Sequence, residues 1–167
     1  MRRPSERDRE FTEFVTARRA ALVRTATLLV SGDSAKAEDV VQTALTKLYL
    51  AWSRVRPDSV DAYAKRCVVN AATDEHRSLF HRREQVRSEL PEVAVHQSAG
   101  DLAGVLGLLA TLPHGMRTAV ALRHVEGLSV AETAHAMGCS EGNVKSQSAR
   151  GLQRLRDLFP STMHPVV

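Results

Sequence analysis

The sequence has few aromatic residues, only two cysteines and no long apolar run. Aromatic side chains make up 4% of its 167 residues, and Cys67 and Cys139 lie far apart inside apolar patterns. So few aromatic residues favour small helical domains over a β-rich fold. Two distant cysteines provide neither a disulfide framework nor the spacing of a metal site, so we expect two buried thiols and no bound metal or cofactor.

Targeting and catalytic motifs are also missing from the sequence. No apolar run is long enough for a transmembrane helix, and the polar N-terminus does not resemble a signal peptide, so we expect a cytoplasmic protein. The seven histidines are scattered, and His76 and His81 lack carboxylate or thiolate ligands at metal-site spacing. No glycine-rich phosphate loop or nucleophile motif occurs. These absences argue against an enzyme and favour a binding function.

What the sequence does contain is helical periodicity and a modest positive charge. Hydrophobic residues make up 43% of the chain and the formal net charge is +4, which suits a polyanionic partner. Apolar residues recur at helical spacing over about 7–29, 35–52 and 60–80, and again from residue 101. The stripe in the first of these segments contains Phe11, Phe14, Val15, Leu22, Ala26 and Leu29.

We therefore predict an all-α protein made of two small helical domains, each with its own core. The first domain is expected at 1–80 and the second at 101–158, with a polar linker at 81–100 that is helical at most at its start. The tail at 159–167 should be frayed. The second domain should open with a short apolar face made by Leu102, Val105, Leu106 and Leu109.

The strongest local pattern is a pair of helices between Leu128 and Leu155. Ser129 is a good N-cap with Glu132 in the capping-box position, Gly138 can end the first helix with a positive φ, and Ser140 can cap the second. The expected buried positions are Leu128, Ala131, Ala134 and Met137 on the first helix, and Val144, Ser148, Leu152 and Leu155 on the second.

The second helix of this pair has a basic face. Residues 142–156 contain four basic side chains and no acidic one. A hairpin with a solvated basic face would explain this, but the small Ala134 at the crossing and the glycine turn favour a DNA-reading helix-turn-helix. Since Lys and Arg can donate to guanine, and Asn and Gln can read adenine, four side chains are candidate base readers. They are Asn143, Lys145, Gln147 and Arg150.

Two earlier helices have polar faces that allow two interpretations each. Asp39 and Gln42 lie off the buried stripe of their helix; acidic groups near a helix start can simply complement the helix dipole, or they can face a partner. Asn70, Asp74 and Arg77 are spaced i, i+4 and i+7 and share one face. That face is either a local polar ladder or a nucleic-acid surface, and helical spacing cannot choose between them.

Three stretches, in this order, resemble the extracytoplasmic-function sigma factors of bacterial RNA polymerase. AEDVVQTALTKLYLAW (37–52) is similar to the helix that grips the polymerase clamp. DAYAKRCVVNAATDEHR (61–77) is similar to the segment that captures the downstream promoter element, and LSVAETAHAMGCSEGNVKSQSARGLQRLR (128–156) to the one that reads the upstream element. The resemblance covers roughly residues 8–158 and is nearest to the actinobacterial SigE-like subgroup.

The resemblance implies a role for particular positions and a set of partners. The implied partners are core RNA polymerase, through its clamp helices and flap, and promoter DNA. An anti-sigma factor is a further candidate partner. The implied polymerase-facing residues are Asp39 and Gln42, with Val41 and Leu45 nearby. The implied promoter contacts are Asn70 and Asp74 at the unpaired non-template base, Arg77 at the backbone, and Lys145, Ser146 and Arg150 at the upstream element.

Promoter opening implies a physical task for the predicted helix at about 60–80. Separating the strands costs on the order of 1.4 kcal/mol per base-pair step. A chain without an ATP-hydrolysing motif can offset this cost by holding an extruded base, as base-flipping proteins do. The Asn70 face together with the Trp52–Val60 loop is our candidate for such a pocket.

The sequence departs from the family pattern at three places. HRSLFHRRE (76–84) interrupts the usual arginine run, LPHGMR (112–117) replaces a more polar loop, and Asn143 stands where Thr is common. The change at 76–84 affects the implied contact with the DNA backbone. Asn143 affects the expected sequence preference at the upstream element.

The alternative function is a stand-alone helix-turn-helix regulator that binds duplex DNA without polymerase. Such a regulator would have a ligand-binding or dimerisation domain in its N-terminal half, with no reason for the Asp39–Gln42 and Asn70–Arg77 blocks. A helical anti-sigma or adaptor protein is disfavoured by the basic second helix. The sequence therefore favours a promoter-specificity subunit that is not itself an enzyme.

Overall fold

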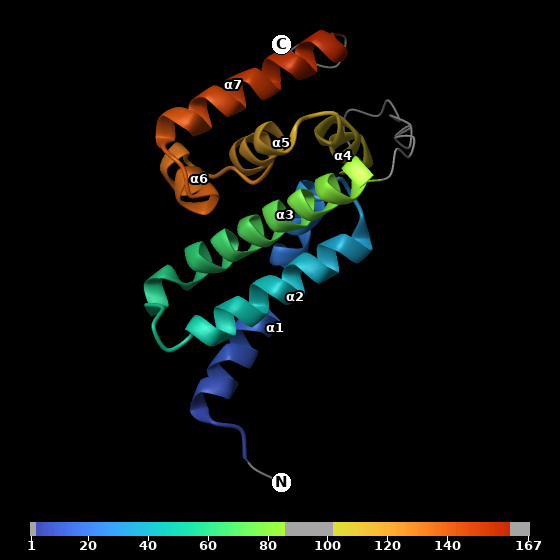
Figure 1. Cartoon of the computed structure of the whole chain (residues 1–167). Coiled ribbons are helices and arrows are strands. Elements are labelled where there is room, and N and C mark those ends of the chain that lie inside the picture. Colours follow the sequence, from blue (N-terminus) through green and yellow to red (C-terminus); the bar gives the residue numbers. More distant parts are fainter. Residues whose placement is uncertain (1–2, 86–101, 161–167) are drawn as a thin grey trace.

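The computed structural model describes residues 3–85 and 102–160, and these contain helices and turns but no strand (Figure 1). The prediction of an all-α protein is confirmed. The N-terminal unit consists of α1 (Glu6–Leu29), α2 (Ser34–Ala51), a 3₁₀ turn at Pro57–Ser59 and α3 (Val60–Gln85). The C-terminal unit consists of α4 (Leu102–Ala110), α5 (His114–Val120), the π-helical segment η2 (Ala121–Val125), α6 (Val130–Met137) and α7 (Glu141–Leu158).

The three N-terminal helices form where their apolar stripes predicted them, and the first two begin at side-chain caps. Ser5 and Asp8 make a capping box at the start of α1, and the Asp33 side chain accepts a hydrogen bond from the Lys36 amide at the start of α2. The predicted α1 stripe is buried at Leu22, Ala26 and Leu29, with its aromatic members packed at the edge of the core. The buried residues of α2 are Ala37, Val40, Val41, Ala44, Leu45, Leu48 and Ala51.

The helix-turn-helix is confirmed, including its caps. The Glu132 amide donates to Ser129 Oγ at 3.0 Å, and the Ser129 amide donates to Glu132 Oε2 at 2.7 Å. Gly138 ends α6 at φ 64°, and Ser140 Oγ accepts a hydrogen bond from the Asn143 amide. One expected core position is wrong, because Ala131 is exposed. The buried face of α6 is formed by Thr133, Ala134 and Ala136.

One boundary moves and two other expectations are wrong. α3 continues to Gln85, five residues past the predicted end, so the predicted linker is helical at its start, as the sequence allowed; residues 86–101 and 161–167 lie outside the described part of the chain. Leu102 does not join the apolar face of α4, since 60% of it is exposed. Cys67 is buried, but Cys139 is only half-buried because it lies in the turn after α6.

The two units pack against each other, with α3 between them (Figure 1). In the view of Figure 1, α1 and α2 lie below α3, and α5, α6 and α7 lie above it. Buried apolar residues of both units belong to one continuous cluster, which runs from Val68 of α3 to Leu112 and Leu122 of the C-terminal unit. The prediction of two small helical domains is confirmed, and their apolar cores meet in this cluster. None of the helices in the described ranges is long and apolar enough to cross a bilayer.

The close crossing of α5 and α7 depends on Gly151. A Cβ at this position would lie 2.6 Å from Cγ2 of buried Val120 and 3.4 Å from Cβ of Met116. We expect Gly151→Ala to lower the free energy of unfolding by about 1–3 kcal/mol, because both neighbours would have to move. Denaturant unfolding followed by circular dichroism measures this change.

The matched control is Gly142→Ala on the same helix. A Cβ there would meet only Ser140 Oγ, at 3.9 Å. Since Ala has the higher helix propensity, this variant should be neutral or more stable by up to about 1 kcal/mol. Equal stabilities for the two variants would contradict the proposed role of Gly151.

Candidate nucleic-acid interface

The predicted reading face lies on the exposed side of α7. Asn143, Lys145, Ser146 and Arg150 are all exposed, whereas Gln147 is half-buried. A Cβ on Gly115 of α5 would lie 3.3 Å from Gln147 Nε2, so the Gln147 amide is packed at the α5–α7 crossing. Gln147 is therefore poorly placed to read a base in this conformation.

The opposite side of α7 fixes the orientation of this face. Val144 is fully buried, and Ser148 is 7% exposed. Ser148 Oγ lies 3.1 Å from Nε2 of His124 in η2. Burial, with a smaller contribution from the charge of Arg123, lowers the pKa of His124. This hydrogen bond joins α7 to the segment that precedes the helix-turn-helix.

The second predicted face lies along α3. Asn70, Asp74 and Arg77 are all exposed, as their spacing predicted. Asp74 Oδ2 lies 3.7 Å from Nζ of Lys47 on α2, so this carboxylate pairs with the neighbouring helix. The pair is exposed and contributes little to stability. It does place a lysine that we had not predicted beside the Asn70 face.

The predicted polymerase-facing residues divide into two pairs. Asp39 and Gln42 are exposed on α2, whereas Val41 is 0% and Leu45 is 8% exposed. Val41 and Leu45 are core residues and cannot meet a partner in this conformation. The sequence also missed Leu50, a further α2 residue that is 69% exposed although apolar.

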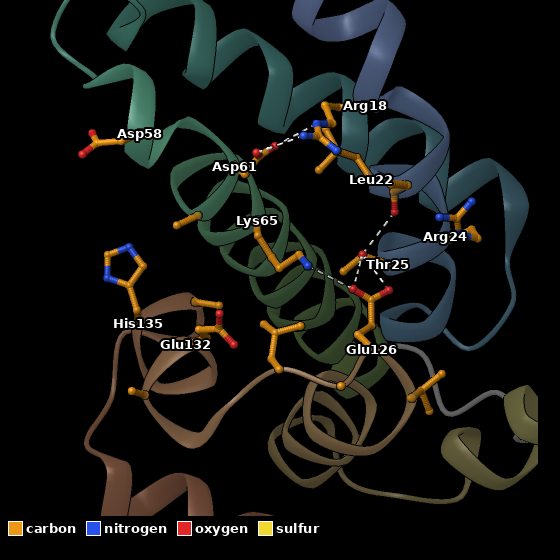
Figure 2. A pocket seen from close by; sticks show the side chains of 17 residues that line it. Arg18, Leu22, Arg24, Thr25, Asp58, Asp61, Lys65, Glu126, Glu132 and His135 are labelled. Carbon is orange, nitrogen blue, oxygen red and sulfur yellow. Dashed lines mark hydrogen bonds and ion pairs between the residues drawn. The ribbon is translucent and has the colours of Figure 1, made fainter.

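The most organised polar contacts lie between the two units. Thr25 Oγ1 lies 2.9 Å from each carboxylate oxygen of Glu126, which lies directly after η2, and its single hydroxyl proton is shared between them. Glu126 also lies 3.3 Å from Lys65 Nζ. Figure 2 shows these groups in the wall of a cavity of about 980 Å³ between α1, the start of α3 and the helix-turn-helix. The predicted base pocket beside Asn70 is a different place, and it stays a prediction.

Arg117 links the same two units. Its guanidinium donates to the carbonyl oxygens of Leu109 and Leu112 within the C-terminal unit, at 3.0 and 2.9 Å, and to that of Leu29 in α1 at 3.2 Å. Burial lowers the pKa of this guanidinium. The half-buried side chain links three chain segments.

His114 makes the third contact between the units. Its Nε2 lies 3.0 Å from Thr73 Oγ1, and its ring stacks on His76 with the centroids 4.6 Å apart. Because the Thr73 hydroxyl donates to the Val69 carbonyl, Nε2 must carry the proton and donate to Thr73, which leaves the buried Nδ1 without a partner. Burial above all, then the charges of His76, Arg117 and Arg77, lower the pKa of His114 to about 4.

No single-helix pattern could have identified these contacts. Arg117 interrupts an otherwise apolar segment, which hints at a buried role, but Glu126 and Thr25 are separated by most of the chain. Among residues 3–85 and 102–160, no group of three His, Cys, Asp or Glu side chains is arranged to hold a metal ion.

Comparison with known proteins gives consistent matches along the chain. The family model described as Sigma-70 region 2 matches residues 14–83, and that described as Sigma-70, region 4 matches residues 103–155. The RNA polymerase sigma-E factor of Streptomyces avermitilis is 39% identical over 91% of this chain and 86% of its own length. The ECF RNA polymerase sigma factor SigM of Mycobacterium tuberculosis is 32% identical over 78% of this chain and 68% of its own length.

A solved structure has the same arrangement of helices. The sigma factor RpoE of Bartonella quintana, crystallised with the anti-sigma factor NepR, superposes with a TM-score of 0.74 at 25% identity. The match covers 91% of this chain and 98% of that one. The packing of the two units is thus included in the similarity.

His114 predicts a pH dependence of stability. Its folded-state pKa of about 4 lies below its ordinary value of 6.5, so its contribution is fully present above 6.5 and is lost as the pH falls toward 4. We expect the free energy of unfolding to fall over this range, and to fall less steeply in His114→Gln, whose amide can still donate to Thr73. Urea unfolding at a series of pH values measures the two slopes.

The control for this measurement is His81→Gln. His81 is exposed on α3. Its replacement should leave the wild-type slope unchanged, and equal slopes in wild type and His114→Gln would refute the assignment.

Proposed function

The chain belongs to the extracytoplasmic-function group of RNA polymerase sigma factors, in its SigE-like part, and we propose how its exposed faces perform that function. It binds core RNA polymerase, directs it to promoters and has no catalytic activity of its own. Residues 1–80 bind the polymerase and the downstream element, and residues 101–158 bind the upstream element. A factor that works on polymerase acts in the cytoplasm.

The observation that best supports this proposal is that three helices each present an exposed polar face at a position that matches the family. The faces are Asp39 and Gln42 on α2, Asn70 and Arg77 on α3, and Lys145 and Arg150 on α7. Each face is held from behind by buried residues of the same helix, such as Val41, Val68 and Val144. The faces are therefore preorganised.

The α7 face combines two kinds of DNA contact. Lys145 and Arg150 neutralise phosphates, which gives salt-dependent affinity. Side chains of this face that reach base edges give sequence preference. Asn143 can form a bidentate pair with adenine. A Thr at this position could not form that pair, so we expect Asn143 to shift upstream sequence preference.

The α3 face is assigned to promoter opening. The Asn70 carboxamide can both donate to and accept from a base edge. Lys47 neutralises Asp74 by the ion pair described above, which lowers the repulsion that a free carboxylate would exert on phosphate. Arg77 is exposed and is assigned to contact with the DNA backbone.

An anti-sigma factor is the expected regulator. RpoE of Bartonella quintana, which has a similar fold, was crystallised with the anti-sigma factor NepR. We extend this class of partner to the present chain.

The first test of the proposal is binding to core polymerase. We expect the wild type to direct run-off transcription with core enzyme, and Asp39→Arg combined with Gln42→Ala to weaken core binding at least about tenfold, as loss of a charged interface contact does. The control is Glu13→Arg, the same charge reversal at an exposed α1 position. If the double variant binds core as the control does, α2 is not the docking face.

The second test separates reading from opening. Asn70→Ala should retain upstream binding but lose permanganate reactivity of unpaired thymines on duplex promoter, and a pre-melted bubble template should restore most of the lost activity. Arg150→Ala should instead weaken promoter binding by about 1–3 kcal/mol on both templates, because its contact precedes opening. Normal duplex opening by Asn70→Ala would leave only a structural role for the α3 face.

A further inference from the structure

Helix α2 has a second exposed side, which borders α3. The two helices pack side by side (Figure 1). Lys47 lies on α2 about 80° from Asp39 and about 140° from Gln42 around the helix axis, at 3.6 residues per turn. Its side chain is 48% exposed, and its ammonium lies 3.7 Å from Asp74 Oδ2 of α3. Lys47 therefore lies outside the strip assigned to polymerase and reaches toward α3.

The side of α3 that Lys47 approaches is basic apart from one residue. Arg66, Asn70 and Arg77 lie along it at i, i+4 and i+11, and all three are exposed. Among the described side chains that share this exposed side, Asp74 is the one carboxylate. The two arginines attract a phosphate backbone, whereas a free carboxylate between them would repel it. The surface therefore needs a cation beside Asp74, and Lys47 is that cation.

Lys47 is close to the part of α3 that contains Asn70. Its ammonium pairs with Asp74, one turn after Asn70, and its charge also acts on Cys67, one turn before Asn70. Burial raises the pKa of the Cys67 thiol, and the charges of Lys47 and Arg66 partly offset that rise. The lysine therefore borders the α3 surface at the point where we place the unpaired base.

The pair with Asp74 leaves Lys47 able to bind a second anion. A lysine ammonium has three donors, and 3.7 Å is longer than a hydrogen bond. The Asp74 side chain is 62% exposed, so solvent screens the pair and its contribution to stability is small. Lysine commonly donates to phosphate oxygens in protein–DNA contacts. Lys47 can thus remain beside Asp74 and donate to a phosphate oxygen at the same time.

We propose that Lys47 binds a phosphate of the downstream promoter element. The pair with Asp74 keeps the ammonium over α3, and the lysine cancels the charge that would repel DNA. Helix α2 then serves two partners, polymerase through Asp39 and Gln42 and the DNA backbone through Lys47. This role of Lys47 rests on the proposed function of the α3 face in promoter opening.

The salt dependence of DNA binding by Lys47→Gln tests this contact. The probe is a fluorescein-labelled single-stranded oligonucleotide of mixed sequence, because a phosphate contact does not depend on sequence. Loss of one contact should lower the slope of log K against log salt by about 0.7, which weakens binding about fourfold at about 0.15 M salt. Lys47→Arg should restore wild-type binding, since a guanidinium also binds phosphate.

The matched control is Arg19→Gln, which removes the same charge from another pair between helices. Arg19 of α1 is 46% exposed and pairs with Glu38 of α2. Glu38 lies about 180° from Lys47 around the axis of α2, so this pair is on the side away from α3. Arg19→Gln should keep the wild-type slope. Equal slopes in Arg19→Gln and Lys47→Gln would show that only net charge matters, and would refute the contact.

A double variant separates contact with phosphate from neutralisation of Asp74. Lys47→Gln combined with Asp74→Asn has the formal net charge of the wild type. It should still bind the oligonucleotide more weakly than the wild type, because a direct contact with phosphate outweighs repulsion from a carboxylate farther away. Binding equal to that of the wild type would mean that Lys47 only neutralises Asp74, and the proposed contact would be wrong.

Urea unfolding of each variant excludes a purely structural role. A pair that only joins α2 to α3 would make Lys47→Gln less stable and leave its salt slope unchanged, which would also overturn the proposal. If the free chain binds the oligonucleotide too weakly to measure, the same variants are compared as holoenzyme on a pre-melted bubble promoter, by the salt dependence of complex stability. Failure of the wild type in run-off transcription would instead count against the proposed function.

Discussion

The structure depends on the burial of α3 from two sides. Val68 is 0% and Val69 3% exposed, and Ala71 and Ala72 are almost as well covered, although α3 has a strongly polar composition. The N-terminal helices cover one side of it and α6 another, so that a single helix belongs to the core of both units. The exposed strip that remains is narrow, and it contains Asn70, Asp74 and Arg77. The same burial that stabilises the fold thus determines which α3 side chains can reach DNA.

The features that could be predicted from the sequence are those set within one helix. Ser129, Glu132, Gly138 and Ser140 are arranged as their spacing predicted, because capping is decided by residues three or four apart. What the sequence could not provide is contact between distant segments. Thr25 and Glu126 have no shared periodicity, and only the folded chain shows that they pair. For the same reason the sequence did not predict that the cores of the two units meet.

Packing also sets limits on some of the predicted site residues. Val41 and Leu45 lie beside Asp39 and Gln42 in the sequence, but they belong to the buried side of α2. Gln147 has the chemistry of a base reader, but its side chain is half-buried beside Gly115 of α5. Leu102 follows an apolar pattern and is still exposed, because it lies at the first position of α4. In each case packing overrides a property of the residue type.

The exposed faces and the buried contact impose different demands on the molecule. Asp39, Asn70 and Lys145 are all exposed while the units pack together. The contact between the units therefore buries none of these three side chains. The contact between the units determines where these side chains lie relative to one another, and it covers the side of α6 that packs on α3. Two kinds of interaction hold the units together. The apolar cluster would be exposed to water if the units separated, whereas Glu126, Arg117 and His114 would exchange their bonds for bonds to water, so apolar burial contributes more to this arrangement than the polar bonds do.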